Sequence, residues 1–102
     1  MMYRCLLSKI QELQVTEANV NYKGSITLCP KIMDKANINE FQEVEVNSKH
    51  GQSRIKTYVI RGRFGDCKLN GGAANFFTVG ELVHINAYGL VKDISKHKPT
   101  LI

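Results

Sequence analysis

The residues of this chain that could do chemistry centre on one peptide bond, between Gly24 and Ser25. A serine is a poor nucleophile unless it is activated. The Ser25 hydroxyl, however, lies close to the carbonyl carbon of Gly24, and its attack there would close a five-membered ring. Glycine tolerates the unusual backbone angles that such an attack needs. Because the three histidines and three cysteines form no cluster, an enzyme built on this chain would have to obtain its electrophile from something other than a standard side chain. A Gly-Ser bond able to rearrange is one of the few such sources.

The cysteines argue against a metal site and against secretion. Cys5, Cys29 and Cys67 are odd in number and far apart, and none has a zinc-ligand spacing. We expect reduced thiols and a cytoplasmic protein. The apolar stretch at residues 1–7 is too short for a secretory signal, and no apolar run approaches the ~20 residues of a membrane span. We therefore expect no membrane partner.

The chain is basic, with 14 Lys and Arg residues against nine Asp and Glu residues and a net charge of +5. A small basic β protein could bind nucleic acid. Its charges are scattered, however, and only Lys92, Lys96, His97 and Lys98 form a local cluster. Aromatic residues do not alternate with basic ones as a stacking platform requires. We expect no nucleic-acid partner, and the charge would also steer small anionic substrates.

Local patterns predict mostly strands. Alternating or β-branched runs indicate strands near residues 13–15, 43–46, 53–60 and 82–88, with a final edge strand at 98–102. Residues 22–28 are typical of a strand interrupted by Gly24, and residues 16–19 of a turn or a single helical turn. Residues 30–36 predict a helix, with a proline in its first turn and Asn37 as a left-handed terminator. Residues 1–102 should form a single domain, mainly β, a small barrel with one or two short helices.

Several short motifs together resemble one family, the pyruvoyl-dependent aspartate 1-decarboxylases. Each is weak alone, but they follow the family's order at nearly its spacing across almost the whole chain. They are Lys9, Val15-Thr16, Tyr22-x-Gly24-Ser25, Arg54-x-x-Thr57-Tyr58, Asn70-Gly71-x-Ala73-Ala74 and Val79-Gly80-Glu81.

The resemblance implies a double-psi β-barrel, a homotetramer with active sites between subunits, and an inactive proenzyme (a zymogen). Autocatalytic cleavage at Gly24-Ser25 would give residues 1–24 (the β chain) and 25–102 (the α chain), with a maturation factor as a potential partner. The cofactor would be a covalent pyruvoyl group derived from Ser25, with no metal. Its ketone would form a Schiff base with L-aspartate, releasing CO2 and β-alanine for pantothenate and coenzyme A biosynthesis.

The resemblance also implies a role for individual residues. Ser25 would carry the pyruvoyl group, and Tyr58 would be the proton donor. Arg54, with its planar fork, and Lys9 would bind a substrate carboxylate. The remaining substrate-binding and supporting residues would be Thr57, Gly71, Gly72, Ala73, Tyr22 and Asn70.

One geometric difficulty follows from strand alternation. On a regular strand Arg54 and Tyr58 share a face, whereas Thr57 points the other way. All three can serve one site only if the strand is bulged, strongly twisted or at a subunit boundary. We predict that Arg54 and Tyr58 are supplied from a neighbouring subunit's strand or its edge.

The chain departs from the family pattern at a few places. Gly72 replaces an alanine, Asn47 stands where a tryptophan is usual, and Gln11 where a histidine is frequent. The turn between residues 64 and 68 is shorter, and many relatives extend beyond Ile102. The alternatives left open are a small basic β-barrel that binds nucleic acid or a protein partner, and a decarboxylase acting on another amino acid such as glutamate.

Overall fold

The structure, a computed structural model, describes residues 1–102 and is dominated by strands. Eight strands form one curved sheet in the order β2-β6-β3-β5-β4-β7-β1-β8. The strands are β1 (Tyr3–Gln14), β2 (Glu17–Asn19), β3 (Ser25–Leu28), β4 (Glu43–Ser48), β5 (Arg54–Arg61), β6 (Cys67–Asn70), β7 (Leu82–Val91) and β8 (Thr100–Leu101). The helices are α1 (Pro30–Ala36) and two 3-10 turns, η1 (Gly71–Phe76) and η2 (Ile94–Lys96).

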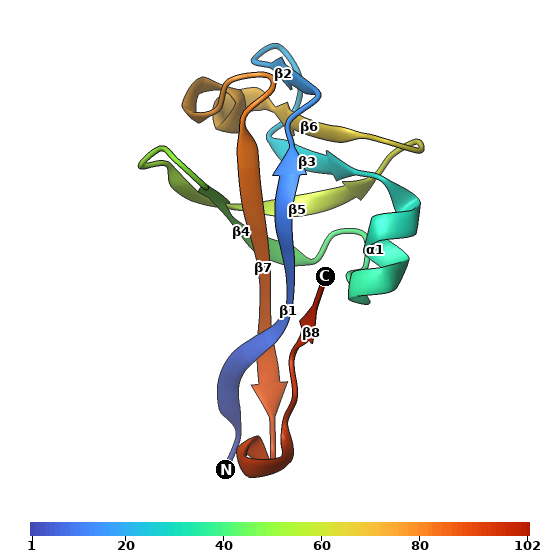
Figure 1. Cartoon of the computed structure of the whole chain (residues 1–102), viewed down its shortest axis with the longest axis vertical. Coiled ribbons are helices and arrows are strands. Elements are labelled where there is room, and N and C mark those ends of the chain that lie inside the picture. The colour runs from blue at the N-terminus through green and yellow to red at the C-terminus, as the bar shows by residue number, and fades with distance from the viewer.

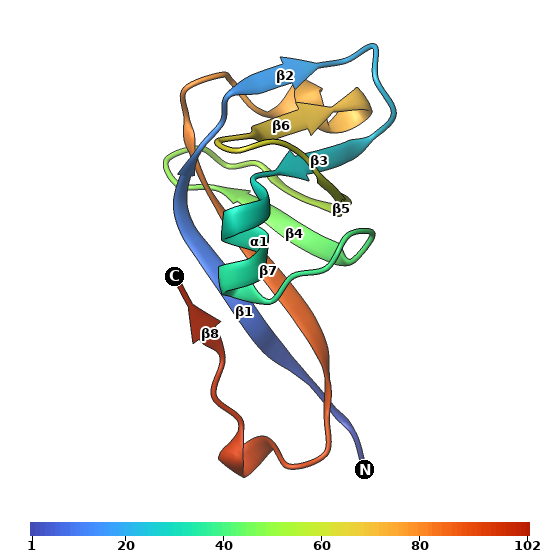
Figure 2. The same ribbon diagram turned by 90° about the vertical axis from the view of Figure 1, so that its right-hand side faces the viewer.

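The sheet has a long part and a compact part. Strands β1 and β7 pair as a long antiparallel ribbon, and the strands from β2 to β6 cross one end of it (Figure 1). Helix α1 packs beside this crossing, while β8 runs along β1 (Figure 2). Pairing is parallel for β2 with β6 and for β3 with β5. Strand β3 also pairs antiparallel with β6, so the strands that carry Ser25, Thr57 and Asn70 are neighbours.

The core lies on the inner face of the curved sheet. Alternation places Val44 and Val46 of β4 inside, opposite Ala87 and Ile85 of β7. Seventeen buried residues form one cluster, to which β3, β5, β6 and α1 also contribute. Because each strand buries every second side chain, the intervening residues of β3, β4, β5 and β7 form an outer face that is mostly polar.

Helix α1 matches its prediction in extent and in both ends. Pro30 opens it, where a missing N–H group costs nothing. Asn37 ends it in the left-handed region at φ 56°. Met33 and Ala36 face the core. No helix in the chain is long and apolar enough to span a membrane.

The predicted fold class, a mainly β small barrel with one or two short helices, is confirmed. The prediction for residues 16–19 is wrong, because Glu17–Asn19 forms the short strand β2. The Thr16 hydroxyl does not cap a helical turn. It accepts from the Cys67 N–H group at 3.0 Å and donates to the Cys67 carbonyl at 3.1 Å, which starts the pairing of β2 with β6. Residues 22–24 form a bend and not a strand, so β3 starts only at Ser25.

Candidate active site

Ser25 is the first residue of β3, and the residue is 1% exposed. It lies opposite Asn70 in the antiparallel ladder with β6. The Asn70 amide nitrogen Nδ2 donates to Ser25 Oγ at 2.9 Å, and the Ser25 hydroxyl donates to the carbonyl of Lys23 at 3.2 Å. The hydroxyl is thus held beside the Gly24-Ser25 peptide bond by one donor and one acceptor. The predicted supporting residue Asn70 is in direct contact with it.

Gly71 packs against the backbone of Gly24. Its φ of +65° lies in the left-handed region, which disfavours any side chain. A Cβ atom at Gly71 would lie 2.5 Å from the Gly24 nitrogen and 2.6 Å from its Cα. The loop that starts at Asn70 therefore packs directly against the backbone of Gly24, the residue on the N-terminal side of the Gly24-Ser25 bond. Gly72, by contrast, is exposed, and a Cβ there would meet nothing within 4 Å.

Thr27 is a site residue that the sequence prediction missed. Asn70 Nδ2 also donates to Thr27 Oγ1 at 2.9 Å, so one amide group joins two hydroxyls of β3. The available signal was the spacing: residues 25 and 27 are two apart on a strand and so share a face.

Tyr58 lies beside Ser25 within the same chain. The parallel ladder pairs Ile26 of β3 with Val59 of β5, and one residue earlier on each strand stand Ser25 and Tyr58. Both point to the face opposite the buried Ile26 and Val59. Because of this register, Tyr58 can reach the Ser25 of its own chain, and the prediction that a neighbouring subunit provides Tyr58 is unnecessary. Thr57 pairs with the core residue Val44 and points the other way, because β5 has no bulge in its pairing with β4.

Arg54 and Lys9 share the outer face but lie away from Ser25. Arg54 is exposed at the start of β5, four residues before Tyr58, which is about 13 Å along a strand. It pairs with Asn47 of β4. Lys9 lies on β1, four places from β3 in the sheet order, and pairs with Asn86 of β7. A single chain therefore brings Ser25, Asn70, Gly71 and Tyr58 together, but not Arg54 or Lys9.

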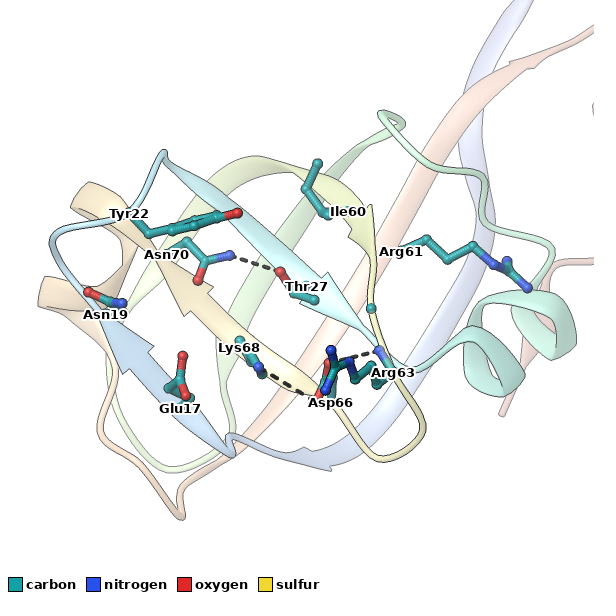
Figure 3. Close-up of a pocket in the computed structure, with 11 residues that line it drawn as sticks. Glu17, Asn19, Tyr22, Thr27, Ile60, Arg61, Arg63, Asp66, Lys68 and Asn70 are labelled. Carbon is teal, nitrogen blue, oxygen red and sulfur yellow. Dashed lines mark hydrogen bonds and ion pairs between the residues drawn. The ribbon is translucent and has the colours of Figure 1, made fainter.

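A polar groove of about 650 Å³ opens next to the Asn70–Thr27 pair (Figure 3). Tyr22, Thr27 and Asn70 line one part of it, and Arg63, Asp66 and Lys68 another. The other lining residues are Glu17, Asn19, Ile60, Arg61 and Gly62. Neither Arg54 nor Tyr58 lines this groove. Ser25 does not line the groove either, whereas its hydrogen-bond partner Asn70 and the neighbouring Thr27 both do.

Some of the charged groups around the groove are already paired. Arg61 contacts both carboxylate oxygens of Asp34 at 3.1 and 3.2 Å, and this pairing lowers the pKa of Asp34. Lys68 lies 3.9 Å from Asp66. Cys67, at the start of β6, is a buried thiol, and burial raises its pKa to about 12. This thiol stays neutral at physiological pH and is a packing residue.

The fold and the site define a small β-barrel protein in which a buried serine hydroxyl is held between an asparagine amide and the carbonyl two residues before it. Residues 1–102 match the model of a family described as aspartate decarboxylase. The aspartate 1-decarboxylase of Campylobacter curvus is 42% identical over 95% of this chain and 86% of the relative. Those of a Sulfurihydrogenibium species and of Bacillus thuringiensis are 41% and 42% identical, over 99% and 95% of this chain and 79% of each relative.

The chain therefore belongs to the aspartate decarboxylase family. This confirms the family predicted from the motifs, and with it the prediction of an enzyme of the decarboxylase class.

Proposed function

We propose that the chain is the proenzyme of a pyruvoyl-dependent aspartate 1-decarboxylase that cleaves itself between Gly24 and Ser25. The observation that carries the proposal is the Ser25 hydroxyl, buried and held by Asn70 and the Lys23 carbonyl next to that bond. Family membership supplies the substrate class, because the curated relatives are named aspartate 1-decarboxylases. The products from L-aspartate would be β-alanine and CO2.

Cleavage would begin with attack of Ser25 Oγ on the Gly24 carbonyl carbon. The new C–O bond forms, the C–N bond breaks, and the nitrogen of residue 25 takes up a proton, which leaves an ester. Loss of the Cα proton of residue 25 then breaks the Cβ–Oγ bond, and Gly24 departs as a carboxylate. Water hydrolyses the remaining enamine, releases ammonia and leaves a pyruvoyl group on residue 25. Asn70 supports this course because its N–H group stays on the oxygen that becomes the leaving carboxylate.

The residues around position 25 fit a pyruvoyl group. Gly71 brings bare backbone against Gly24, the residue before this position, with no side chain to fill the space. Once formed, the ketone supplies an electron sink of the kind that pyridoxal phosphate supplies elsewhere. Tyr58 would hold the proton that the substrate carbon needs after CO2 leaves, a role that its position next to Ser25 in the register of β3 and β5 supports.

The remaining substrate contacts would come from the residues for which the family resemblance implies substrate binding. Arg54 would hold a carboxylate through its planar fork, and Lys9 would add positive charge. The segment Gly71, Gly72 and Ala73 would complete the pocket with backbone N–H groups. Thr57, which points away from the Ser25 of its own chain, would add its hydroxyl at a subunit boundary.

We also propose that the active enzyme is a homotetramer with sites between subunits. Arg54 and Lys9 lie on the outer face of the sheet, away from the Ser25 of their own chain. A second subunit that packs on this face would bring its Ser25 to them. The enzyme would work in the cytoplasm and supply β-alanine for pantothenate and coenzyme A biosynthesis, and a maturation factor would be an added partner.

Mass spectrometry of the purified protein tests the cleavage directly. We expect two fragments, residues 1–24 and 25–102, the second with its first residue converted to pyruvoyl. Ser25→Ala should abolish both cleavage and CO2 release from aspartate. The matched control is Ser95→Ala, at an exposed serine in η2, which should behave as wild type. A chain that stays intact and still releases CO2 from aspartate would contradict the proposal.

Substrate choice needs a separate assay. The processed protein should be given L-aspartate and L-glutamate at equal concentration, and CO2 release measured for each. Faster turnover of glutamate would transfer the proposal to a longer substrate and leave the cleavage chemistry unchanged.

A further inference from the structure

We propose that Thr27 is a positioning residue for self-cleavage, which acts by holding the Asn70 amide on Ser25. This inference rests on the proposed function, because it concerns how fast the Gly24-Ser25 bond rearranges. The Thr27 hydroxyl does not touch the reacting atoms. It touches the side chain that does.

The hydrogen bonds at Asn70 define the arrangement. The Ser25 hydroxyl donates its hydrogen bond to the Lys23 carbonyl, so its oxygen is the acceptor in the bond from Asn70. An asparagine amide nitrogen has two protons, and the second goes to Thr27 Oγ1 at the same distance of 2.9 Å. Both protons of the amide are thereby engaged, one on each hydroxyl of β3.

The position of Thr27 is itself set by Gly62. A Cβ atom at Gly62 would lie 2.4 Å from Thr27 Cγ2 and 2.6 Å from Asp66 Oδ2. Real Cβ atoms do not approach other atoms so closely, so a side chain at position 62 would force Thr27 to rotate. Asp66 is held in turn by the backbone N–H group of Arg63 at 2.8 Å. The absence of a side chain at Gly62 therefore keeps the Thr27 hydroxyl directed at Asn70.

Loss of the Thr27 hydroxyl would free one proton of an amide that is only 4% exposed. An unpaired buried N–H group is unfavourable, and the groove that Asn70 lines offers an alternative partner, water. Rotation of the amide toward the groove would draw the other N–H group away from Ser25 Oγ. Cleavage would then lose a donor on its leaving oxygen at the step where the Cβ–Oγ bond breaks.

The test measures the rate of cleavage of freshly synthesised chain, followed over time by the mass of the two fragments. Thr27→Val keeps the shape but removes the hydroxyl, and should slow cleavage about fivefold, the effect of one neutral hydrogen bond. Thr27→Ser keeps the hydroxyl and should cleave within about twofold of wild type. Thr100→Val, at an exposed threonine of β8, is the matched control and should match wild type.

The outcomes separate the two proposals. If wild-type chain never cleaves, even in a cell extract that supplies a maturation factor, the proposed function fails. If it cleaves and Thr27→Val cleaves at the same rate, or Thr27→Ser is as slow as Thr27→Val, the role of Thr27 is overturned and the proposed function stands.

Gly62→Ala provides a second route if Thr27→Val does not fold, as judged by circular dichroism. It leaves the hydroxyl in the chain but displaces it, so it should also slow cleavage. A folded Gly62→Ala protein that cleaves like wild type overturns the proposal as well.

Discussion

Gly71→Ala should destabilise the fold and impair cleavage, because Gly71 has no room for a side chain. Two costs arise from the structure. The left-handed φ of +65° costs an alanine about 1–2 kcal/mol, and overpacking against backbone costs about 1–3 kcal/mol more. The added Cβ would press on Gly24 at 2.5 Å and on the Tyr22 carbonyl at 2.7 Å. Since these atoms are backbone, they cannot rotate away, and the sum of about 2–5 kcal/mol is a large part of a small domain's stability.

The assay is urea denaturation, carried out in a Ser25→Ala background so that every chain stays intact. Gly72→Ala is the matched control for stability, because a Cβ there meets nothing within 4 Å and its φ lies outside the left-handed range. Its free energy of unfolding should stay within about 1 kcal/mol of the parent. In the Ser25 background, Gly71→Ala should also yield fragments more slowly than wild type. Equal unfolding free energies for the two alanine variants would refute the reasoning.

Three further predictions concern the site and the core. Arg54→Lys keeps the charge but loses the bidentate fork, so the chain should cleave normally while KM for aspartate rises about tenfold; an unchanged KM would remove Arg54 from the substrate site. Tyr58→Phe should cleave but lose at least about a hundredfold in kcat, and full turnover would exclude Tyr58 as the proton donor. The raised pKa of Cys67 keeps its thiol neutral in the folded chain while the unfolded chain ionises above its ordinary value of 9.0. Stability should therefore fall by about 1.4 kcal/mol per pH unit from pH 9 toward 12, and a Cys67→Ala variant with the same slope in denaturation would contradict this.

Local signals predicted those elements whose causes are local. Pro30 and Asn37 mark both ends of α1, and the alternation at residues 43–46 predicted β4 together with its buried face. The shared face of Arg54 and Tyr58 also followed from alternation, since β5 pairs with β4 without a shift.

Features that depend on distant pairing could not be found in this way. Strand β2 has only three residues, and its partner β6 lies about fifty residues further along the chain. The contact of Asn70 with Ser25 spans 45 residues, and only the ladder of β3 with β6 aligns them. The motifs predicted that Asn70 matters, but the second bond to Thr27 required the structure.

The position of the Gly24-Ser25 bond explains how the fold could survive the cut. Because β3 begins at Ser25, the residues after the bond already pair with β5 and β6. The residues before it are anchored separately, through β1 on β7 and through β2 on β6. Residues 20–24 between β2 and β3 form no strand, so the segment that ends at the cut contributes no residue to the ladder. A new end at residue 25 would remain opposite Asn70, since the ladder that aligns them is formed by residues 25–28, which follow the broken bond.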